Sequence, residues 1–378
     1  MKSRHLLPLL ALMCLSAAPP SAHTTEGTLV SWGGKDFFGL EGATPVGSFS
    51  MVDVGAYHGV ALRPDGSSIA WGWDEYGQVS EKPAGTFSAI AAGGNHNVAI
   101  RPDGTLVSWG ADFFGERSKT PTNGSYSAVA AGAFHNVAIR TDGTLTSWGW
   151  DAYNQVSGTP AGTFSAVAAG YSHSVALRTD GTLVSWGSDG SCEVRCTPGG
   201  TFLTIAAGAF HNVAIRTDGT LASWGTDYYG EVNLTPPGSF VAVAAGYSHS
   251  VAIRTDGTLV AWGNDCCGQV SGTPEGTFSA VAAGSTYNVA IVKSPAERVN
   301  DLIALVQGMS IQHGVKNALI VKLQATLAAI NASDSSTACA RLQAFLNLVH
   351  AQTGKKLTPA QATQLLDAAT RLRAALGC

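Results

Sequence analysis

The stretch that decides the fold is Val167–Gly187, VAAGYSHSVALRTDGTLVSWG, because close copies of it fill the middle of the chain. The Trp-Gly pair that closes it occurs seven times, at successive spacings of 39, 38, 39, 38, 38 and 38 residues. The tryptophans of these pairs are Trp32, Trp71, Trp109, Trp148, Trp186, Trp224 and Trp262. Self-similarity at a fixed period near 38 residues predicts a repeat architecture.

One repeat has the pattern of short antiparallel strands. Phe164–Ala169 and Ser174–Leu177 are β-prone runs, Thr182–Trp186 is the returning strand, and a run around Val194 is expected to supply a fourth. Asp180-Gly181 stands between the second and third runs and predicts a type I′ hairpin, in which both central residues have positive φ. Four short strands in about 40 residues are typical of a propeller blade.

The two ends of the array favour closure into a ring. The array opens in mid-repeat at Glu26–Trp32 and finishes in mid-repeat at Tyr287–Lys293. The first fragment therefore supplies the strand that the last one lacks, and no edge strand is left unpaired. We predict an all-β, closed, seven-bladed β-propeller over residues 23–293.

The repeated motifs also carry a family resemblance. Gly-x-x-His, Asp-Gly-x-Leu and Trp-Gly-x-Asp-x-x-Gly-Gln (Trp71–Gln78 and Trp262–Gln269) resemble the repeat of the regulator of chromosome condensation family over about residues 26–293. The resemblance implies a seven-bladed propeller. Its members include nuclear exchange factors for a small GTPase, plant light receptors and secreted bacterial β-lactamase inhibitors, so the resemblance leaves the function open.

Residues 1–22 have the pattern of a secretory signal peptide. Lys2 and Arg4 form a basic start, Leu6–Ala18 is apolar, and cleavage is expected after Ala22, with Ala18 as the alternative. The apolar run is too short for a membrane span. We therefore expect a secreted or periplasmic (extracellular) protein without a membrane span.

Six cysteines remain after removal of the signal peptide, and an exported chain permits disulfides. Cys192 and Cys196 fall in one loop, which favours a local bridge. Cys266 and Cys267 are adjacent, and a strained vicinal bridge or two free thiols remain equal alternatives. The spacing does not match a zinc site. We expect no metal and no cofactor.

The composition changes at Ser294, where Gly and Trp nearly vanish and Ala, Leu and Gln take over. Residues 294–378 are predicted to form a small all-α helical bundle with helices near 295–309, 315–331, 336–353 and 359–376. Antiparallel packing of the last two helices places Cys339 beside Cys378, which predicts a second disulfide.

The same C-terminal segment resembles a helical module found at the C-termini of exported bacterial proteins. The resemblance lies in Leu357–Ala362, LTPAQA, and in Leu376–Cys378, LGC. The resemblance leaves the function of this segment open, and we expect it to be an accessory module for docking or attachment.

Charge divides along the same boundary. Residues His23–Lys293 carry 12 Lys and Arg against 22 Asp and Glu, a net charge of −10, whereas the residues from Ser294 onward carry 8 against 4. An acidic propeller lacks the basic surface that phosphate binding requires, so nucleic acid is not an expected partner.

The slot three residues after a repeated glycine holds a histidine in six repeats and a tyrosine in the seventh. Equivalent slots lie apart around a ring and cannot converge on one metal ion, so we expect a structural role, with hydrogen bonds to the backbone where blades meet. The aspartates after the tryptophans and in the Asp-Gly pairs are explained by turn chemistry. The slot is filled by His58, His96, His135, His173, His211, His249 and Tyr287.

Aromatic residues vary between repeats and gather in two sets of loops. Because strand direction alternates, the first-to-second and third-to-fourth loops of every blade share one face. Aromatic side chains with polar groups are enriched in binding surfaces, whereas packing between blades is the alternative of equal weight. The predicted binding face comprises Tyr57, Trp73, Tyr76, Phe113, Phe114, Phe134, Trp150, Tyr153, Tyr171, Phe210, Tyr228, Tyr229 and Tyr247, with Phe37 and Phe38 in the first loop.

The leading hypothesis is an exported, non-enzymatic and monomeric binding protein whose propeller face recognises another protein. Inhibition of an extracellular enzyme is one concrete version. The alternatives are a glycan or cell-surface adhesin, a guanine-nucleotide exchange factor by family analogy only, and an enzyme, for which the sequence contains no recognisable catalytic motif.

Overall fold

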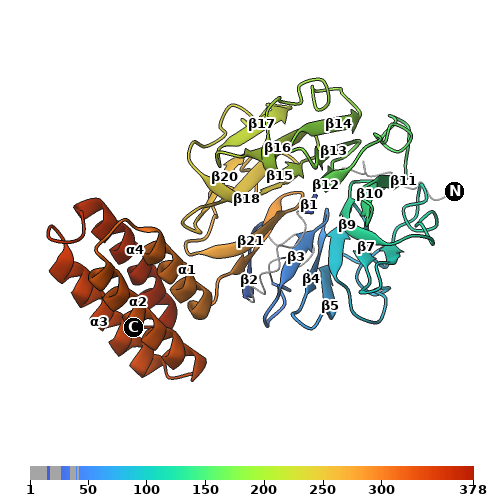
Figure 1. The fold of residues 1–378 in the computed structure, drawn as a ribbon. Helices are drawn as coiled ribbons and strands as arrows, with labels where there is room; N and C mark the ends of the chain where they lie inside the picture. Colours follow the sequence, from blue (N-terminus) through green and yellow to red (C-terminus); the bar gives the residue numbers. More distant parts are fainter. Residues whose placement is uncertain (1–14, 18–26, 35–39, 41) are drawn as a thin grey trace. The chain divides into compact units, whose positions relative to one another are not determined.

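The computed structural model describes residues 15–17, 27–34, 40 and 42–378. The chain divides into two compact units, one ending at Val292 and the other spanning Lys293–Cys378 (Figure 1). The predicted signal peptide lies outside the described residues except for Leu15–Ala17, and Phe37 and Phe38 lie outside them as well.

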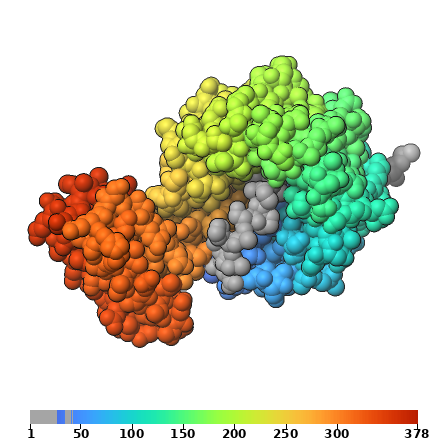
Figure 2. All heavy atoms as spheres, viewed as in Figure 1, coloured from blue at the N-terminus to red at the C-terminus, as the bar shows by residue number. Residues whose placement is uncertain are grey.

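The first unit consists of seven antiparallel sheets, each with an inner, a middle and an outer strand. In space-filling view the blades follow one another around the ring in chain order (Figure 2). The sheets are β3–β5 (Met51–Val54, His58–Leu62, Ser68–Gly72), β6–β8 (Ala89–Ala92, His96–Ile100, Leu106–Gly110), β9–β11 (Tyr126–Ala131, His135–Arg140, Leu145–Gly149), β12–β14 (Phe164–Ala169, His173–Arg178, Leu183–Gly187), β15–β17 (Phe202–Ala207, His211–Arg216, Leu221–Gly225), β18–β20 (Phe240–Ala245, His249–Arg254, Leu259–Gly263) and β21, β22 and β2 (Phe278–Ala283, Tyr287–Val292, Thr28–Gly33). A short strand, β1 (Leu15–Ala17), pairs antiparallel with β12.

The seventh sheet closes the ring as the sequence predicts. β2 pairs antiparallel with β22, from Thr28 opposite Val292 to Gly33 opposite Tyr287. The buried Tyr287 side chain then crosses to the first blade, where its hydroxyl donates to the carbonyl oxygen of His58 at 2.6 Å. The prediction of a closed seven-bladed propeller is confirmed.

Among the described residues, the predicted fourth strand of the blades is not formed. Val194, where the sequence predicts it, lies in a run of turns, and no described blade has a fourth strand at its outer edge; the one four-stranded sheet gains β1 at its inner edge. The reason is that the aspartate after each tryptophan draws the chain into a turn. Asp189 accepts hydrogen bonds from the backbone N–H groups of Val194 at 2.9 Å and Arg195 at 3.1 Å, so those groups do not join a ladder.

The predicted type I′ hairpin is also wrong. Gly181 has φ +86°, but Asp180 is not among the residues with positive φ. Arg178 N–H donates to Thr182 O at 2.8 Å and Gly181 N–H donates to Arg178 O at 2.9 Å, which defines a three-residue loop of the type I turn plus bulge kind. Asp180 instead uses its side chain, whose Oδ1 accepts the Thr182 N–H at 2.9 Å.

Small residues let the inner strands approach the propeller axis. Ala168 and Ala169 of β12 are fully buried, and blade faces pack through mixed clusters such as Leu177 of one blade with Phe202 and Trp224 of the next. The seven tryptophans are all 2–6 % exposed, so each fills the space between two blades.

The second unit is a four-helix bundle, as predicted, with α1 (Pro295–Gly308), α2 (His313–Asn331), α3 (Ser335–Gln352) and α4 (Pro359–Leu376). Capping boxes begin α1 at Ser294 and α4 at Thr358. The apolar stripes meet in one core that includes Val299, Leu342 and Phe345.

The bundle also brings its two cysteines together. Cys339 in the first turn and a half of α3 and Cys378 after the end of α4 are paired as a disulfide, with their Cα atoms 5.9 Å apart. In the part of the chain that the structure describes, no helix is both long and apolar enough to cross a bilayer.

Candidate protein-binding face

The histidines of the repeat join neighbouring blades. All six are 0–1 % exposed. Each ring Nε2 is hydrogen-bonded to a side-chain oxygen of the next blade. His58 Nε2 is bonded to Asn97 Oδ1 at 2.8 Å, and His135 Nε2 to Ser174 Oγ at 2.8 Å. The predicted structural role is therefore seen, but the predicted backbone partner is wrong. Asn and Ser follow the histidine of the next repeat, so the partner slot is itself repeated.

Burial lowers the pKa of these histidines far below the ordinary value near 6.5. It takes the pKa of His173 to about 4, although the bond to Asn212 opposes the shift, and that of His211 to about 3. The rings are neutral at neutral pH, and the described residues contain no group of three or more metal-ligating side chains.

A buried Gln or Glu follows each Trp-Gly-x-Asp-x-x-Gly motif. It links the hydrogen bonds between blades to the loop that follows the third strand of its own blade, which we call the apex loop. The backbone oxygen of Glu116 accepts from Trp148 Nε1 at 2.9 Å and Asn136 Nδ2 at 3.2 Å, both on the next blade. Its side-chain Oε2 accepts the N–H of Phe114 at 2.8 Å and so holds the apex of its own loop.

The same arrangement recurs in the other described blades. Gln78 holds the N–H of Tyr76, Gln155 that of Tyr153, and Glu231 that of Tyr229, at 2.8–2.9 Å. These positioning residues are not among the predicted site residues, although their place at the end of the repeated motif is a signal that identifies them. Burial raises the pKa of Glu116, Glu193 and Glu231.

In six of the seven repeats, the aspartate three residues after the tryptophan also stiffens this loop. Asp265 Oδ1 accepts the N–H groups of Val270 at 2.8 Å and Ser271 at 3.0 Å, and the hydrogen bond from Ser271 is the main cause that lowers the pKa of Asp265. The apex of each loop is thus fixed from two sides, by the Asp and by the Gln or Glu. Rigid support of this kind favours a loop used for recognition.

The structure brings many of the predicted aromatic residues into contact. One cluster joins two apex loops through Trp73–Tyr76 at 5.4 Å and Tyr76–Phe113 at 5.0 Å between ring centroids, with Tyr57 at its edge. A second cluster runs from Tyr153 through Trp150 and Phe134 to Tyr171, Phe210 and Tyr247, at centroid distances of 5.4–5.8 Å. Phe114 joins this second cluster through Phe134 and Trp150.

The two sets of loops differ in how far their rings are exposed. The first-to-second loop rings Tyr57, Phe134, Tyr171 and Tyr247 are half-buried over the buried Ala56 and Ala133 near the axis. The exposed rings are at the loop apices, where Phe113 is 47 %, Phe114 42 %, Tyr153 51 %, Tyr229 55 % and Tyr228 85 % exposed. Half-buried rings thus support exposed rings at the loop apices, and whether the exposed rings bind a partner stays a prediction.

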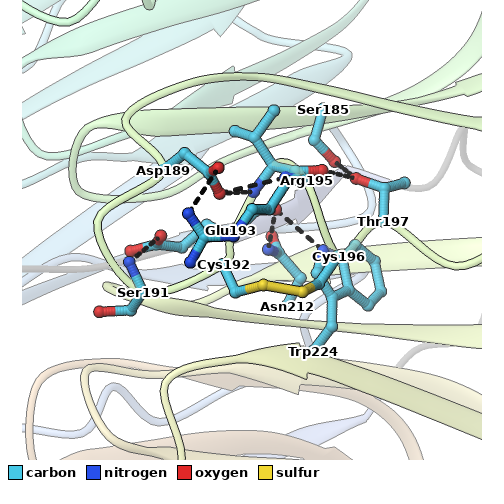
Figure 3. Close-up of a disulfide and its surroundings, with 11 residues drawn as sticks. Ser185, Asp189, Ser191, Cys192, Glu193, Arg195, Cys196, Thr197, Asn212 and Trp224 are labelled. Atoms are coloured by element: carbon cyan, nitrogen blue, oxygen red, sulfur yellow. Dashed lines mark hydrogen bonds and ion pairs between the residues drawn. A yellow bond between two sulfur atoms is a disulfide. The ribbon is translucent and has the colours of Figure 1, made fainter.

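The apex loop after β14 carries cysteines instead of aromatic residues (Figure 3). Cys192 has φ +72° at the position that Gly115 and Gly230 hold in other blades, and it is paired with Cys196 four residues later. The repeat explains the pairing, because a Cβ added at Gly115 would lie 2.6–2.7 Å from the side chain of Lys119, also four residues later.

Cys266 and Cys267 occupy the loop apex after β20, where the blade before has Tyr228 and Tyr229. Their sulfur atoms lie 3.1 Å apart and are not joined as a disulfide in the structure.

Comparison with known proteins identifies the repeats. Residues 52–78, 87–116, 126–155, 164–192, 202–231 and 240–269 match the family described as Regulator of chromosome condensation (RCC1) repeat. The propeller unit belongs to this family of RCC1-type propellers. The six matches leave out the seventh blade, which is assembled from the two ends of the array. No curated protein matches the chain in sequence.

Several solved structures resemble the chain. Prp20p of Saccharomyces cerevisiae, described with its binding properties to Gsp1p and histones, is 20 % identical, with a TM-score of 0.61 over 72 % of this chain and 92 % of its own. Human WBSCR16 is 16 % identical, with a TM-score of 0.58 over 72 % and 100 %. The ectodomain of the Physcomitrella patens receptor kinase CR4 is 21 % identical, with a TM-score of 0.52 over 69 % of both chains. Identities this low show the fold alone.

Proposed function

We propose that the protein is a non-enzymatic binding protein whose propeller recognises another protein through the aromatic face. The observation that carries the proposal is the pair of aromatic clusters, which end in exposed rings on loops fixed by the Asp and by the Gln or Glu. Exposed aromatic residues on rigid supports bury much area at little cost in conformational entropy, which is the property of interface anchors.

The related propellers support a binding role. Prp20p was described with its binding properties to Gsp1p and histones, and it was also solved with Kap60. RCC1-type propellers generally bind proteins or act as exchange factors rather than as catalysts. We do not carry over the exchange activity, because it rests on the family alone and the resemblance to solved structures extends only to the fold.

The proposal is tested by affinity capture from the medium in which the producing cells grow. The bait is the chain from residue 23 onward, beside the variant Tyr76→Ala, Tyr153→Ala and Tyr229→Ala. The control variant is Leu203→Ala with Val241→Ala, which removes two exposed apolar side chains at the other end of the strands, 59 % and 60 % exposed.

We expect the parent and the control to capture the same protein and the triple variant to lose it. Capture that survives in the triple variant and fails in the control would overturn the aromatic face as the binding site. Inhibition of an extracellular enzyme predicts, in addition, that the captured protein loses activity in proportion to the propeller added.

Location outside the cytoplasm is part of the proposal and rests on residues 1–22. Expression of the full chain followed by mass measurement of the exported protein tests it. A mature protein that begins at His23 supports export, whereas a cytoplasmic chain that retains Met1 contradicts it.

A further inference from the structure

The aromatic rings at the two ends of the blades differ in whether a cationic side chain lies over them. At the hairpin end, each of six blades places one of its own arginines over an aromatic ring at, or two residues before, the start of its inner strand. The distances from guanidinium carbon to ring centroid are 5.1–5.6 Å for Arg63 over Phe49, Arg101 over Phe87, Arg140 over Tyr126, Arg178 over Phe164, Arg216 over Phe202 and Arg254 over Phe240. Each arginine also has an aspartate two residues later, so this end is electrically balanced.

The apex end is not balanced. Outside the buried Glu and Gln positions, the six described apex loops carry Asp74, Glu75, Asp112, Asp151, Asp189, Asp227 and Asp265. Their positive charges are Arg117, Lys119 and Arg195, of which Arg117 is paired with Glu81 at 2.9 Å and Arg195 with Asp189 at 3.5 Å, so the acidic side chains outnumber the basic ones. The loops that carry the aromatic face therefore surround it with net negative charge.

The rings nearest the axis have other rings as neighbours. Tyr171 stacks on Phe210 at 5.5 Å, and Phe210 meets Tyr247 edge-on at 5.7 Å. Among the described residues, no arginine or lysine lies over these three rings, in contrast to the hairpin end. A ring face attracts a cation electrostatically, and surrounding carboxylates strengthen that attraction.

We propose that the aromatic face accepts Lys or Arg side chains from a basic segment of a partner protein. A guanidinium or ammonium group rests on the rings of Tyr171, Phe210 and Tyr247, and the carboxylates of the apex loops surround it. This inference rests on the proposed function, since it names the chemistry of the partner that the same face binds. The negative charge of this face repels the phosphates of polyphosphate partners, so we do not expect such partners here.

The probe is a fluorescein-labelled Gly/Ser peptide with four arginines, and its match is the same peptide with four citrullines, which keep the shape and lose the charge. Binding to the chain from residue 23 onward is followed by fluorescence anisotropy at low and at physiological ionic strength. We expect the arginine peptide to bind roughly 10-fold or more tightly than the citrulline peptide at low salt, with the difference shrinking as salt rises.

Matched charge variants locate the site. Asp151→Asn, Asp227→Asn and Asp265→Asn remove three charges at the apex end and keep the side-chain oxygen that accepts the backbone N–H groups. Asp142→Asn, Asp180→Asn and Asp218→Asn remove three charges at the hairpin end and likewise keep the Asp-type turn. We expect the apex triple variant to lose about 5-fold or more in affinity and the hairpin triple variant to stay within about 2-fold of the parent.

Ring variants separate cation recognition from folding. Tyr171→Leu with Tyr247→Leu is expected to lower the affinity for the arginine peptide several-fold, whereas Tyr171→Phe with Tyr247→Phe keeps the rings and is expected to retain it. Equal binding of the arginine and citrulline peptides, or equal losses in the apex and hairpin triple variants, would overturn the inference. If a captured protein depends on Tyr76, Tyr153 and Tyr229 while the peptides bind equally, the proposed function stands and the basic partner is wrong.

Discussion

Different interactions stabilise the interior of the propeller and the interior of the helical unit. The propeller buries a histidine and an Asn or Ser in nearly every blade, and the helical unit buries one polar side chain, Thr326, whose hydroxyl donates to the carbonyl of its own helix at 3.0 Å. Ala-rich inner strands offer few large apolar groups, so register between blades depends on buried hydrogen bonds. The helices have continuous Leu, Val and Phe stripes and need no such bonds.

The largest expected difference between the two units is in their loss of stability at acid pH. The buried histidines have folded pKa values near 3–4, below the unfolded value near 6.5, so their neutral form contributes stability that is complete above pH 6.5 and is lost as the pH falls toward 4. Each histidine that is protonated on unfolding costs about 1.4 kcal/mol per pH unit within this window. Circular dichroism melts between pH 7 and 4 measure the effect.

The helical unit is the internal control for this experiment. Its two histidines, His313 and His350, are exposed, so its melting should change much less between pH 7 and 5. Burial raises the pKa of Asp53 and of three glutamates in the propeller, and these groups titrate in the opposite sense and moderate the slope. A propeller whose melting temperature is the same at pH 7 and pH 5 would contradict the prediction.

Removal of the disulfide in the helical unit should destabilise that unit and not the propeller, which is the opposite of the effect of acid. Cys339→Ser with Cys378→Ser opens a loop of 39 residues, which on the chain-entropy estimate costs about 4 kcal/mol. Calorimetry should show the transition of the helical unit shifted down and that of the propeller unchanged. Alkylation without reductant tests the bridge directly, because an unchanged mass supports it and labelling of both thiols rules it out.

A single inter-blade bond should have a smaller effect. His211→Leu fills the slot with an apolar side chain and leaves Ser250 Oγ without the bond it makes to His211 Nε2 at 2.8 Å. We expect a loss of about 2 kcal/mol in the free energy of unfolding, from a buried hydroxyl left without this partner. Chemical denaturation measures it. His211→Asn places a shorter polar group in the slot. If it loses as much free energy of unfolding as His211→Leu, the reach of the side chain to Ser250 matters, and its polarity alone does not.

The exposed rings should matter least for stability. Tyr153→Ala removes a side chain that is 51 % exposed and leaves its backbone N–H bonded to Gln155. We expect a change within about 0.5 kcal/mol by chemical denaturation, since surface substitutions away from packed features have small effects. A loss near that of His211→Leu would place Tyr153 in the structural lattice and weaken the proposal that its ring serves binding.

Sequence reasoning succeeded where one residue type has one physical consequence. Pro295 and Pro359 with their capping boxes mark helix starts, Gly377 ends α4 with φ +76°, and the split repeat pairs β2 with β22. It failed where a side chain competes with the backbone for hydrogen bonds. Asp189 took the N–H groups expected in a fourth strand, and Asp180 took one at the hairpin.

The sequence by itself determined the number of blades, the closure of the ring and the four helices, because period, split ends and caps are local or counted features. Only the tertiary structure decided the partners that lie a whole repeat away. The bond from His58 to Asn97, the clamp of Glu116 on Trp148 and the meeting of Phe210 with Tyr247 all cross between blades. Such contacts depend on the angle and spacing of neighbouring sheets, which come from packing and not from the order of residues in one repeat.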